Sequence, residues 1–398
     1  MVRLAILSTH PIQYNAPAFA GLAGHPDLEV KVFYEWEGTS IKPDREFGRT
    51  VAWDVPLLDG YDSSFLPNRA KDPGTHHFRG IDNPGVVDAI SAWRPDVLLV
   101  YGWAHASHLR ALRYFHGRVP ILFRGDSTLL DERPAWRRAA RRAALRMVYR
   151  NVDAALYPGE ASRRYFLAHG LEPQQLHWAP HAVDNDRFSS DAARKEMLAR
   201  QWRTRLGISP DAVVFLFSGK LVRWKDPELL LEAFIGISRS AVPPVPHLVF
   251  AGDGDLLQSL RSRCDSREDV HFTGFQNQSV MPIVYRLGDV TMLPSARDTW
   301  GLAVNESMAA QRAAIVSDRV GCALDLIKPL KTGIVFEAGN KASLEEAMAY
   351  CVANTKDLRS MGQEAGQLID GWSIGEFVSA TAAAVNKLHS QVSRGGRR

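Results

Sequence analysis

Short apolar runs alternate with longer helical stretches along the 398 residues of the chain. Most runs are continuous rather than alternating, which is typical of strands covered on both faces by helices in a parallel sheet. In the first half, strands are predicted at Arg3–Leu7, Val30–Tyr34, Val97–Tyr101, Ile121–Phe123, Ala154–Tyr157 and Leu176–Ala179. In the second half, they are predicted at Val213–Ser218, Leu248–Ala251, Val270–Thr273, Val290–Leu293, Ala314–Ser317 and Ile334–Phe336. Such alternation predicts α/β domains with right-handed crossovers.

The element order predicts two doubly wound, Rossmann-like domains, residues 1–186 and 187–372, that face each other across a cleft. The break is predicted within Val183–Pro210, which contains the charged helical stretch Asp191–Leu206. A polar stretch with several prolines, Asp44–Asp82, is predicted to be an irregular excursion without chemistry. Ligands of doubly wound sheets bind beyond the carboxyl ends of the strands, so function is expected in the loops that follow them.

Composition removes several classes of protein. With 45% hydrophobic and 23% charged residues, the chain is neither disordered nor a disulfide-stapled miniprotein. The 48 basic and 44 acidic residues are too balanced for a nucleic-acid binder. Cys264, Cys322 and Cys351 form no C-x-x-C pair, which favours a reducing compartment without a zinc knuckle. No apolar run approaches the roughly 20 residues of a membrane span, and the N-terminus has no signal-peptide layout, so we expect a cytoplasmic protein.

The strongest chemical pattern is the segment from Leu293 to Ala309, LPSARDTWGLAVNESMA. A strand ends, a loop carries Asp298, a helix begins near Gly301, and Glu306 follows eight positions after the first acid. Free backbone N–H groups at a helix start attract an anion, and a glycine lets the backbone approach it closely. Eight residues span at most roughly 12 Å of helix, which suits acids at the two ends of a nucleoside diphosphate. The alternative is a surface helix with two solvated acids.

A second pattern, FSGKLVRWKD, follows the first strand of the second half. The strand ends at Gly219, and Lys220 and Lys225 follow five residues apart. Two such cations can clamp a diphosphate and neutralise the charge that develops on a leaving group. The alternative is a solvated basic turn.

Together and in this order, the two segments resemble the retaining GT-B glycosyltransferases of family 4, the glycosyl transferases group 1. That family has a G-R-x-x-x-x-K loop and a P-S-x-x-E-x-x-G-x-x-x-x-E helix. Further similar segments are Leu248–Gly254, Val270–Phe275, Ile315–Gly321 and His181–Phe188. The resemblance runs from about Val152 to Lys387. It implies a first domain that binds the acceptor and a second that binds a nucleoside-diphosphate sugar. It also implies a crossing at Gly371–Ser373, after which a last helix, 373–390, returns to the first domain.

The resemblance implies roles for individual residues. Lys220 and Lys225, next to Gly219, are expected to hold the donor diphosphate, and Asp298 to contact hydroxyls of the transferred sugar. Glu306 is expected to bind the ribose hydroxyls. The backbone amides expected to contact the sugar and phosphate are those of Thr299, Trp300, Gly301 and Leu302. Phe275 is expected to line the base pocket.

The chain departs from the family pattern at two of these positions. Lys220 replaces the usual arginine and loses its bidentate fork. Asp298 replaces the first glutamate and shortens its reach by one methylene. The resemblance implies transfer with retained anomeric configuration, without a metal, by front-face attack.

Candidate acceptor residues follow the strands of the first half. His10, Gln13 and Tyr14 lie in the loop after the first strand, where many relatives have a Gly-Gly loop, and are expected to bind acceptor or phosphate. The alternative is a loop held by its own hydrogen bonds. Trp103 and His105 follow the third predicted strand and are expected to line an acceptor pocket. The alternative is that they are packed in the core.

Asp126 follows the next strand, in the segment FRGDS. Many relatives have a histidine near this position, close to the reaction centre. Asp126 is expected to orient a hydroxyl or to act as a base. Burial raises the pKa of a carboxyl group, whereas the neighbouring Arg124 opposes that shift. The alternative is an aspartate that caps the next helix.

An arginine-rich stretch, residues 133–150, contains seven arginines and no acid. At helical spacing, one face is predicted to carry Arg137, Arg138, Arg141, Arg142 and Arg146. The opposite face is predicted to carry Trp136, Ala140, Ala144, Met147 and Val148. Such a helix can bind anionic lipid head groups at the inner membrane face, or an anionic acceptor. The alternative is a solvated helix whose arginine stems cover apolar surface.

Two further patterns are discounted. Gly252-Asp253-Gly254-Asp255 contains a D-x-D spacing, but two such acids need further ligands to bind a cation, and we predict no metal. Neither half has a G-x-G-x-x-G after its first strand, which argues against a nicotinamide enzyme.

The sequence therefore predicts a glycosyltransferase that needs no cofactor and takes a UDP- or GDP-sugar as donor. Its acceptor is a glycan, a lipid-linked sugar or a small molecule. Three alternatives remain open, one of which is a lipid-dependent scaffold that would need the arginine-rich stretch and tolerate the loss of Lys225. A GT-B sugar-nucleotide epimerase would use the same donor site without an acceptor, and a non-catalytic sensor would bind the donor without turning it over.

Overall fold

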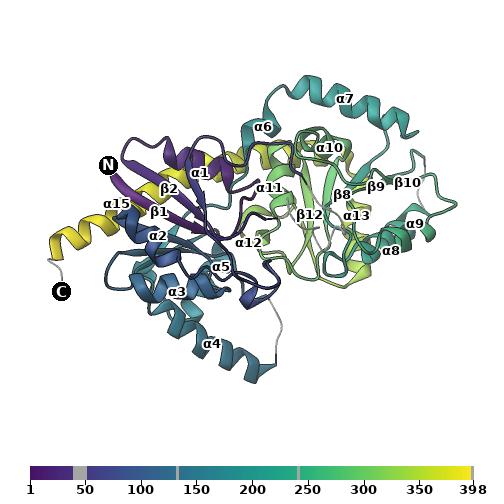
Figure 1. The fold of residues 1–398 in the computed structure, drawn as a ribbon. Coiled ribbons are helices and arrows are strands. Elements are labelled where there is room, and N and C mark those ends of the chain that lie inside the picture. Colours follow the sequence, from purple (N-terminus) through teal and green to yellow (C-terminus); the bar gives the residue numbers. More distant parts are fainter. Residues whose placement is uncertain (39–51, 131–133, 240–242, 396–398) are drawn as a thin grey trace. The chain divides into compact units, whose positions relative to one another are not determined.

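The computed structural model describes residues 1–38, 52–130, 134–239 and 243–395, with side chains up to residue 391. The chain forms two compact units, each described by itself below (Figure 1). Unit 1 comprises residues 1–42, 56–181 and 374–398, and unit 2 comprises residues 43–55 and 182–373. The sequence analysis drew the boundary after residue 186 and did not foresee that residues 52–55 belong to unit 2.

Unit 1 is built around a seven-stranded parallel sheet with the order β3-β2-β1-β4-β5-β6-β7. The strands are β1 (Val2–Ser8), β2 (Leu28–Tyr34), β3 (Asp62–Phe65), β4 (Val97–Tyr101), β5 (Ile121–Arg124), β6 (Ala154–Tyr157) and β7 (Leu176–Trp178). In β1, Leu4 to Leu7 are fully buried, and each large apolar side chain of this kind contributes roughly 1.5–3 kcal/mol. All six strands predicted for this half are confirmed.

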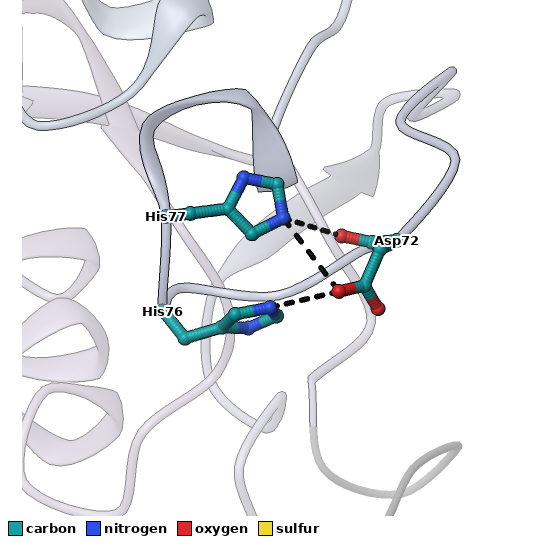
Figure 2. A group of neighbouring side chains, drawn as sticks. All are labelled: Asp72, His76 and His77. Atoms are coloured by element: carbon teal, nitrogen blue, oxygen red, sulfur yellow. Dashed lines mark hydrogen bonds and ion pairs between the residues drawn. The ribbon is translucent and has the colours of Figure 1, made fainter.

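The helices of unit 1 lie between these strands along the chain, except the last one. They are α1 (Ala16–Ala23), η1 (Phe78–Gly80), α2 (Val86–Trp93), α3 (Ala106–Phe115), α4 (Ala135–Tyr149), α5 (Glu160–Ala168), η2 (Pro173–Gln175) and the last helix α15 (Ile374–Gly395), which packs against α1. Strand β3 lies in the stretch predicted to be irregular. It was missed because DSSF has no apolar run and none of its residues is buried. Between β3 and η1, the side chains of Asp72, His76 and His77 point toward one another (Figure 2).

Unit 2 is built around a six-stranded parallel sheet with the order β10-β9-β8-β11-β12-β13. The strands are β8 (Val214–Ser218), β9 (His247–Ala251), β10 (Val270–Phe272), β11 (Val290–Leu293), β12 (Ala313–Ser317) and β13 (Gly333–Phe336). All six predicted strands are confirmed. The helices are α6 (Asn185–Ser189), α7 (Ala192–Arg205), η3 (Arg223–Lys225), α8 (Pro227–Ser238), α9 (Leu257–Ser262), α10 (Met281–Leu287), α11 (Leu302–Ala309), α12 (Ala323–Leu326), α13 (Lys341–Ala353), α14 (Thr355–Ile369) and η4 (Asp370–Trp372).

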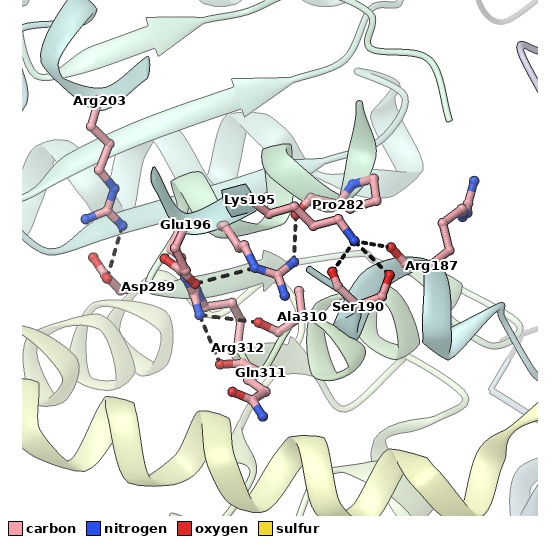
Figure 3. A network of polar contacts seen from close by, with 12 residues as sticks. Arg187, Ser190, Lys195, Glu196, Arg203, Pro282, Asp289, Ala310, Gln311 and Arg312 are labelled. Atoms are coloured by element: carbon pink, nitrogen blue, oxygen red, sulfur yellow. Dashed lines mark hydrogen bonds and ion pairs between the residues drawn. The ribbon is translucent and has the colours of Figure 1, made fainter. Parts of the chain in front are cut away.

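Helix α7 corresponds to the predicted charged stretch, and only Ala199 of it is buried. Ion pairs hold it to the rest of unit 2 (Figure 3). Glu196 binds Arg312 at 2.5 Å, and Arg203 binds Asp289 at 3.0 Å. A helix with so few apolar positions depends on such polar contacts for its place. Among the helices of the described residues, none is both long and apolar enough to cross a membrane.

Candidate functional site

The strand order of unit 2 reverses between β8 and β11, which are hydrogen-bonded neighbours. In doubly wound sheets, ligands bind beyond the carboxyl ends of the two strands at such a switch point. The two patterns singled out in the sequence follow these same two strands. Their loops contact each other directly, since the N–H of Ala296 donates to the carbonyl oxygen of Trp224 at 2.9 Å. The topology therefore brings both motifs to one place in unit 2.

Lys225 and Asp298 form an ion pair at this place, with the Lys225 ammonium donating to Asp298 Oδ2. The side chains are 23% and 13% exposed, so the pair is largely shielded from solvent. Asp298 Oδ1 also accepts the N–H of Trp300 at 3.3 Å. Lys220 is half-buried in the preceding loop, and Thr299 is exposed. The predicted phosphate cation and the predicted sugar acid are thus direct partners.

Helix α11 begins as predicted, with Gly301 as its N-cap at φ +94°. A Cβ atom at Gly301 would lie 2.7 Å from Leu293 Cδ2 and 2.8 Å from Val320 Cγ1, so no other residue fits there without a shift of the core. No side chain caps this helix start, and Leu302, its first residue, is half-buried. Because the N-cap residue is a glycine, no side chain of its own covers the first N–H groups of α11, and a helix start of this kind suits an anion.

The Trp300 side chain is part of the core rather than of a binding surface. It is 2% exposed, its ring lies 5.2 Å from that of Trp372, and its Nε1–H donates to Asn305 at 2.8 Å. Cys322 is fully buried nearby. Burial raises the pKa of its thiol, and Asp298 adds to the shift. A thiol held protonated in this way is a poor nucleophile.

Glu306 lies on α11 and is 2% exposed. Its Oε2 accepts a 2.6 Å hydrogen bond from the Tyr285 hydroxyl, and Arg187 Nη2 lies 4.0 Å from Oε1. Arg187 in turn donates to the side-chain oxygen of Gln278 at 2.9 Å. Tyr285 and Arg187 were not predicted as site residues, although Arg187 lies inside the similar segment His181–Phe188. These contacts fix the position of the carboxylate expected to bind ribose.

Phe275 is half-buried in the loop after β10 and has a neighbour from the first half of the sequence. The ring of Trp53 lies 6.2 Å from that of Phe275. Asp54 Oδ1 accepts the N–H of Ser279 at 3.0 Å, and the Asn277 side chain donates to the Ala52 carbonyl oxygen at 2.8 Å. Residues 52–54 of the stretch Asp44–Asp82, which was predicted to be irregular and without chemistry, therefore contact the loop after β10. The remainder of that stretch up to residue 51 lies outside the described residues.

The D-x-D spacing after β9 has a structural role. The Asp253 carbonyl oxygen accepts the N–H of Leu221 at 2.9 Å, and Asp253 Oδ1 accepts the N–H of Gly254 at 2.9 Å. These bonds join the loop after β9 to the lysine loop after β8, next to Gly219, which is half-buried. The segment is therefore explained by its hydrogen bonds to the lysine loop of the candidate site.

A separate cavity of about 350 Å³ lies elsewhere in unit 2, near the last residues of α11. Its lining includes the side-chain amides of Asn185, Gln311, Gln363 and Gln367. The residues singled out in the sequence do not line it.

In unit 1, the strand order reverses between β1 and β4, and the candidate acceptor residues follow these strands. The His10 ring lies 5.5 Å from the ring of Trp36, and the Thr9 hydroxyl oxygen lies 3.0 Å from His10 Nδ1. Gln13 and Tyr14 are half-buried. Trp103 is half-buried against the core of this unit. His105 is 6% exposed, and burial, followed by the charge of His108, lowers its pKa to about 4. The residue is therefore a neutral imidazole at neutral pH.

A contact between two buried polar side chains next to His105 was not predicted. His108 Nε2 lies 3.1 Å from Glu35 Oε2, with side chains 1% and 0% exposed. Glu35 directly follows β2, so a single glutamate after an apolar run was the available signal.

Asp126 is half-buried in the loop after β5. The alternative that it caps the next helix is wrong, because α4 has Pro134 as its N-cap residue. Its neighbour Arg124 is buried, donates to the carbonyl oxygens of Ala179 and Pro180 at 3.0 Å, and lies 4.7 Å from the Phe377 ring. Burial lowers the pKa of Arg124, and the charge of Asp126 opposes that shift.

The apolar face predicted for the arginine-rich helix is wrong. Trp136 and Met147 are 68% and 65% exposed, and the buried residues of α4 are Leu145 and Tyr149. Tyr149 packs in the core with its ring 5.5 Å from that of Phe123, which sets the rotation of the helix. Ala140 and Ala144 are also exposed, and Val148 is half-buried.

Arg141 differs from the other arginines of the predicted set. It is half-buried, and its Nε and Nη2 donate to the Tyr165 hydroxyl at 3.2 and 3.1 Å. Arg137, Arg138, Arg142 and Arg146 are exposed. These four arginines are thus exposed on α4, as are Trp136 and Met147.

Comparison with known proteins gives matches in both halves. The sequence profile of the family described as Glycosyl transferases group 1 matches residues 199–368, and that of the Glycosyl transferase 4-like domain matches residues 23–182. A D-inositol 3-phosphate glycosyltransferase of Streptomyces bingchenggensis is 23% identical, in an alignment that covers 100% of this chain and 90% of the relative. A GDP-mannose-dependent alpha-mannosyltransferase of Mycolicibacterium smegmatis is 26% identical over 79% of this chain and 80% of the relative.

Among solved structures, Anabaena Alr3699/HepE in complex with UDP has a similar fold, with a TM-score of 0.73 and 16% identity over 97% of this chain and 100% of that one. The two profiles together span most of the chain, and the second matches the half in which the sequence motifs are weaker. The chain therefore belongs to the family-4 glycosyltransferases, the glycosyl transferases group 1, and has the GT-B fold.

Proposed function

We propose that the chain transfers a sugar from a nucleoside-diphosphate sugar to an acceptor hydroxyl, with retention of the anomeric configuration and without a metal. One observation carries the proposal: Lys225, Asp298 and the uncapped start of α11 meet at the switch point of the unit 2 sheet. A cation, a carboxylate and open amides suit a donor whose diphosphate lies next to a hydroxyl-bearing sugar. The similar Anabaena structure holds UDP, and a relative uses GDP-mannose, so both bases remain candidates.

The proposed chemistry is leaving-group stabilisation. As the bond between the anomeric carbon and the diphosphate oxygen breaks, negative charge grows on that oxygen. Lys220, Lys225 and the first amides of α11 would stabilise it, and they increase the rate only as far as their contacts strengthen in the transition state. The acceptor hydroxyl would attack from the same face and give its proton to the departing diphosphate. No covalent intermediate is required.

The Lys225–Asp298 ion pair gives this step a defined starting state. A donor phosphate would compete with Asp298 for the lysine, and the released carboxylate would accept hydrogen bonds from sugar hydroxyls. The pair holds both side chains in place before the donor arrives, which reduces the entropy lost on binding. Both members thus act on one ligand at adjoining positions.

The nucleoside end is proposed to lie toward Phe275 and Glu306. Glu306 would accept the ribose hydroxyls, and Tyr285 would hold its carboxylate in position. Trp53 lies beside Phe275 and would add a second aromatic surface for the base. His10, Gln13, Tyr14, Trp103 and His105 are proposed to bind the acceptor, with Asp126 orienting a hydroxyl or serving as base.

The test is a product assay with a panel of UDP- and GDP-sugars, each with and without hydroxyl-bearing acceptors. The proposal expects acceptor-dependent release of the nucleoside diphosphate and an α-linked product from an α-linked donor, seen in the NMR coupling of the anomeric proton. Donor affinity in EDTA should equal that in Mg²⁺. A new sugar nucleotide formed without acceptor would instead identify an epimerase, and donor binding without any turnover would identify a sensor.

We further propose that α4 contacts an anionic lipid surface. Its exposed residues include four arginines, Trp136 and Met147, and residues of these kinds bind anionic head groups and the boundary between head groups and acyl chains. Replacing Arg138, Arg142 and Arg146 by glutamine should reduce co-sedimentation with phosphatidylglycerol vesicles. Replacing the exposed Arg194, Arg200 and Arg205 of α7 is the matched control and should not. Equal loss from both triple variants would contradict a role specific to α4.

A further inference from the structure

A group of potential metal ligands lies in unit 1, apart from every residue assigned above (Figure 2). Asp72, His76 and His77 come from one short loop between β3 and η1. In the described part of the chain, they are the one group of three or more such side chains whose ligand atoms all lie within 4.8 Å of one another. The sequence analysis did not foresee this group.

The loop is shaped so that both histidines face the same carboxylate. Side chains of adjacent residues in an extended chain point in opposite directions. Here, however, His76 Nε2 lies 2.9 Å from Asp72 Oδ2, and His77 Nε2 lies 3.1 Å from the Asp72 carbonyl oxygen and 3.8 Å from Oδ2. Gly74 makes the turn at φ +154°, where a Cβ atom would lie 2.6 Å from His76 Nδ1. The loop is closed by the N–H of Gly74, which donates to the Gly80 carbonyl oxygen at 3.0 Å.

These separations match a small tetrahedral ion. Zinc binds imidazole nitrogen and carboxylate oxygen at about 2.0–2.2 Å, so two of its ligand atoms lie about 3.3–3.5 Å apart. The distances from Asp72 Oδ2 to the two Nε2 atoms, 2.9 and 3.8 Å, bracket that value. Three ligands from one loop leave the fourth position to water. The side chains are between 32% and 49% exposed, so an ion can reach them directly from solvent.

We propose that Asp72, His76 and His77 bind one divalent transition-metal ion, with Zn²⁺ as the preferred species. Two imidazoles with one carboxylate suit zinc and its neighbours in the series, whereas Mg²⁺ and Ca²⁺ prefer oxygen ligands throughout. The role is structural. The backbone of His77 and Phe78 lies against His105, so the ion fixes a loop that borders the candidate acceptor residues. The proposal is independent of the donor site, which lies in unit 2.

The experiment uses the full chain without a histidine tag, stripped of metal with a chelator and titrated with ZnCl₂ by calorimetry. The expected result is one Zn²⁺ per chain with a micromolar or tighter Kd. His76→Ala and His77→Ala should each weaken binding at least about tenfold. Replacing the exposed His116 at the end of α3 by alanine is the control and should leave the affinity unchanged.

Cobalt provides a readout that does not depend on affinity alone. Co²⁺ bound to the wild-type chain should give the intense visible absorption of a tetrahedral site, and Asp72→Asn should weaken that band. Circular dichroism establishes that each variant is folded. The proposal is overturned if the wild-type chain binds no Zn²⁺ even at a concentration about 100-fold above the expected micromolar Kd. It is also overturned if both histidine variants bind Zn²⁺ as tightly as the wild type. An octahedral cobalt spectrum would likewise contradict the assigned ligands.

Discussion

The loops at the two switch points occupy the same place in two similar sheets, yet they carry different chemistry. After β8 and β11, unit 2 has two lysines, an aspartate paired to one of them, and an uncapped helix start. After β1 and β4, unit 1 has His10, Trp103 and His105, which are aromatic or imidazole groups. Burial and His108 keep His105 neutral by lowering its pKa to about 4.

This contrast teaches what each loop pair can bind. Fixed charges and open amides select a multiply charged anion, and few ligands other than a diphosphate satisfy them together. Neutral rings and half-buried polar groups fit a hydroxyl-rich ligand, but many different acceptors share those properties. Under the proposed function, the loops of unit 2 therefore indicate the class of donor, whereas those of unit 1 leave the acceptor open.

The largest effect should come from removing the cation in unit 2. Lys225→Ala is expected to lower kcat/KM for transfer by at least about 100-fold, because the departing diphosphate loses a charged partner. Arg223→Ala, an exposed residue of the same short helix η3, is the control. Steady-state kinetics measures both, and thermal melting establishes that both fold. Equal turnover of Lys225→Ala and the wild type would remove the basis of the contrast.

The neutral imidazole of unit 1 can be tested through stability. His105 has a native pKa of about 4 and an unfolded value near 6.5, so between these values the unfolded chain binds more protons. The free energy of unfolding should therefore fall as the pH drops from 7 toward 4.5. The His105→Asn variant should lose less over this range, by about 2 kcal/mol. Urea unfolding at both pH values measures it, and parallel losses would mean that His105 titrates normally.

The ribose contact should have a smaller effect. Glu306→Gln is expected to raise the donor KM about tenfold with a smaller change in kcat, since it removes a charged hydrogen-bond acceptor. Tyr285→Phe should raise the donor KM less, because it frees rather than removes the carboxylate. Glu346→Ala on the exposed side of α13 serves as the control. Calorimetric titration with the donor would contradict the assignment if Glu306→Gln binds it as well as the wild type.

The smallest effect is expected at Trp53. Trp53→Ala should raise the donor KM about threefold to tenfold, the loss of one stacking surface on a base. Trp178→Ala, a partly exposed tryptophan of unit 1, is the matched control. Fluorescence quenching by the donor should also weaken in Trp53→Ala. A donor KM unchanged in this variant would restrict the base pocket to the loops of unit 2 after residue 182.

Strands and the charged loops were predictable because each has a strong local signal. Continuous apolar runs located all twelve predicted strands, and the spacing of Lys220, Lys225, Asp298 and Glu306 indicated the two motifs that the topology brings together. Strand β3 was missed because its sequence, DSSF, has no buried residue and depends on pairing with β2.

The remaining features depend on contacts between distant segments. Trp53 and Phe275 are more than 200 positions apart, and nothing near Trp53 indicates its partner. The rotation of α4 was predicted wrongly because arginine spacing alone does not show that Tyr149 packs against Phe123. Tyr285 contacts Glu306 from a different helix, so neither sequence segment alone predicts this hydrogen bond.

The most direct measurement is a crystal structure of the chain with an intact nucleoside-diphosphate sugar. The account predicts that the diphosphate lies at the first amides of α11, with the Lys225 ammonium moved from Asp298 to a phosphate oxygen at about 2.8 Å. The Asp298 carboxylate should then accept hydroxyls of the sugar. A diphosphate bound elsewhere, with the Lys225–Asp298 ion pair still in place, would contradict it.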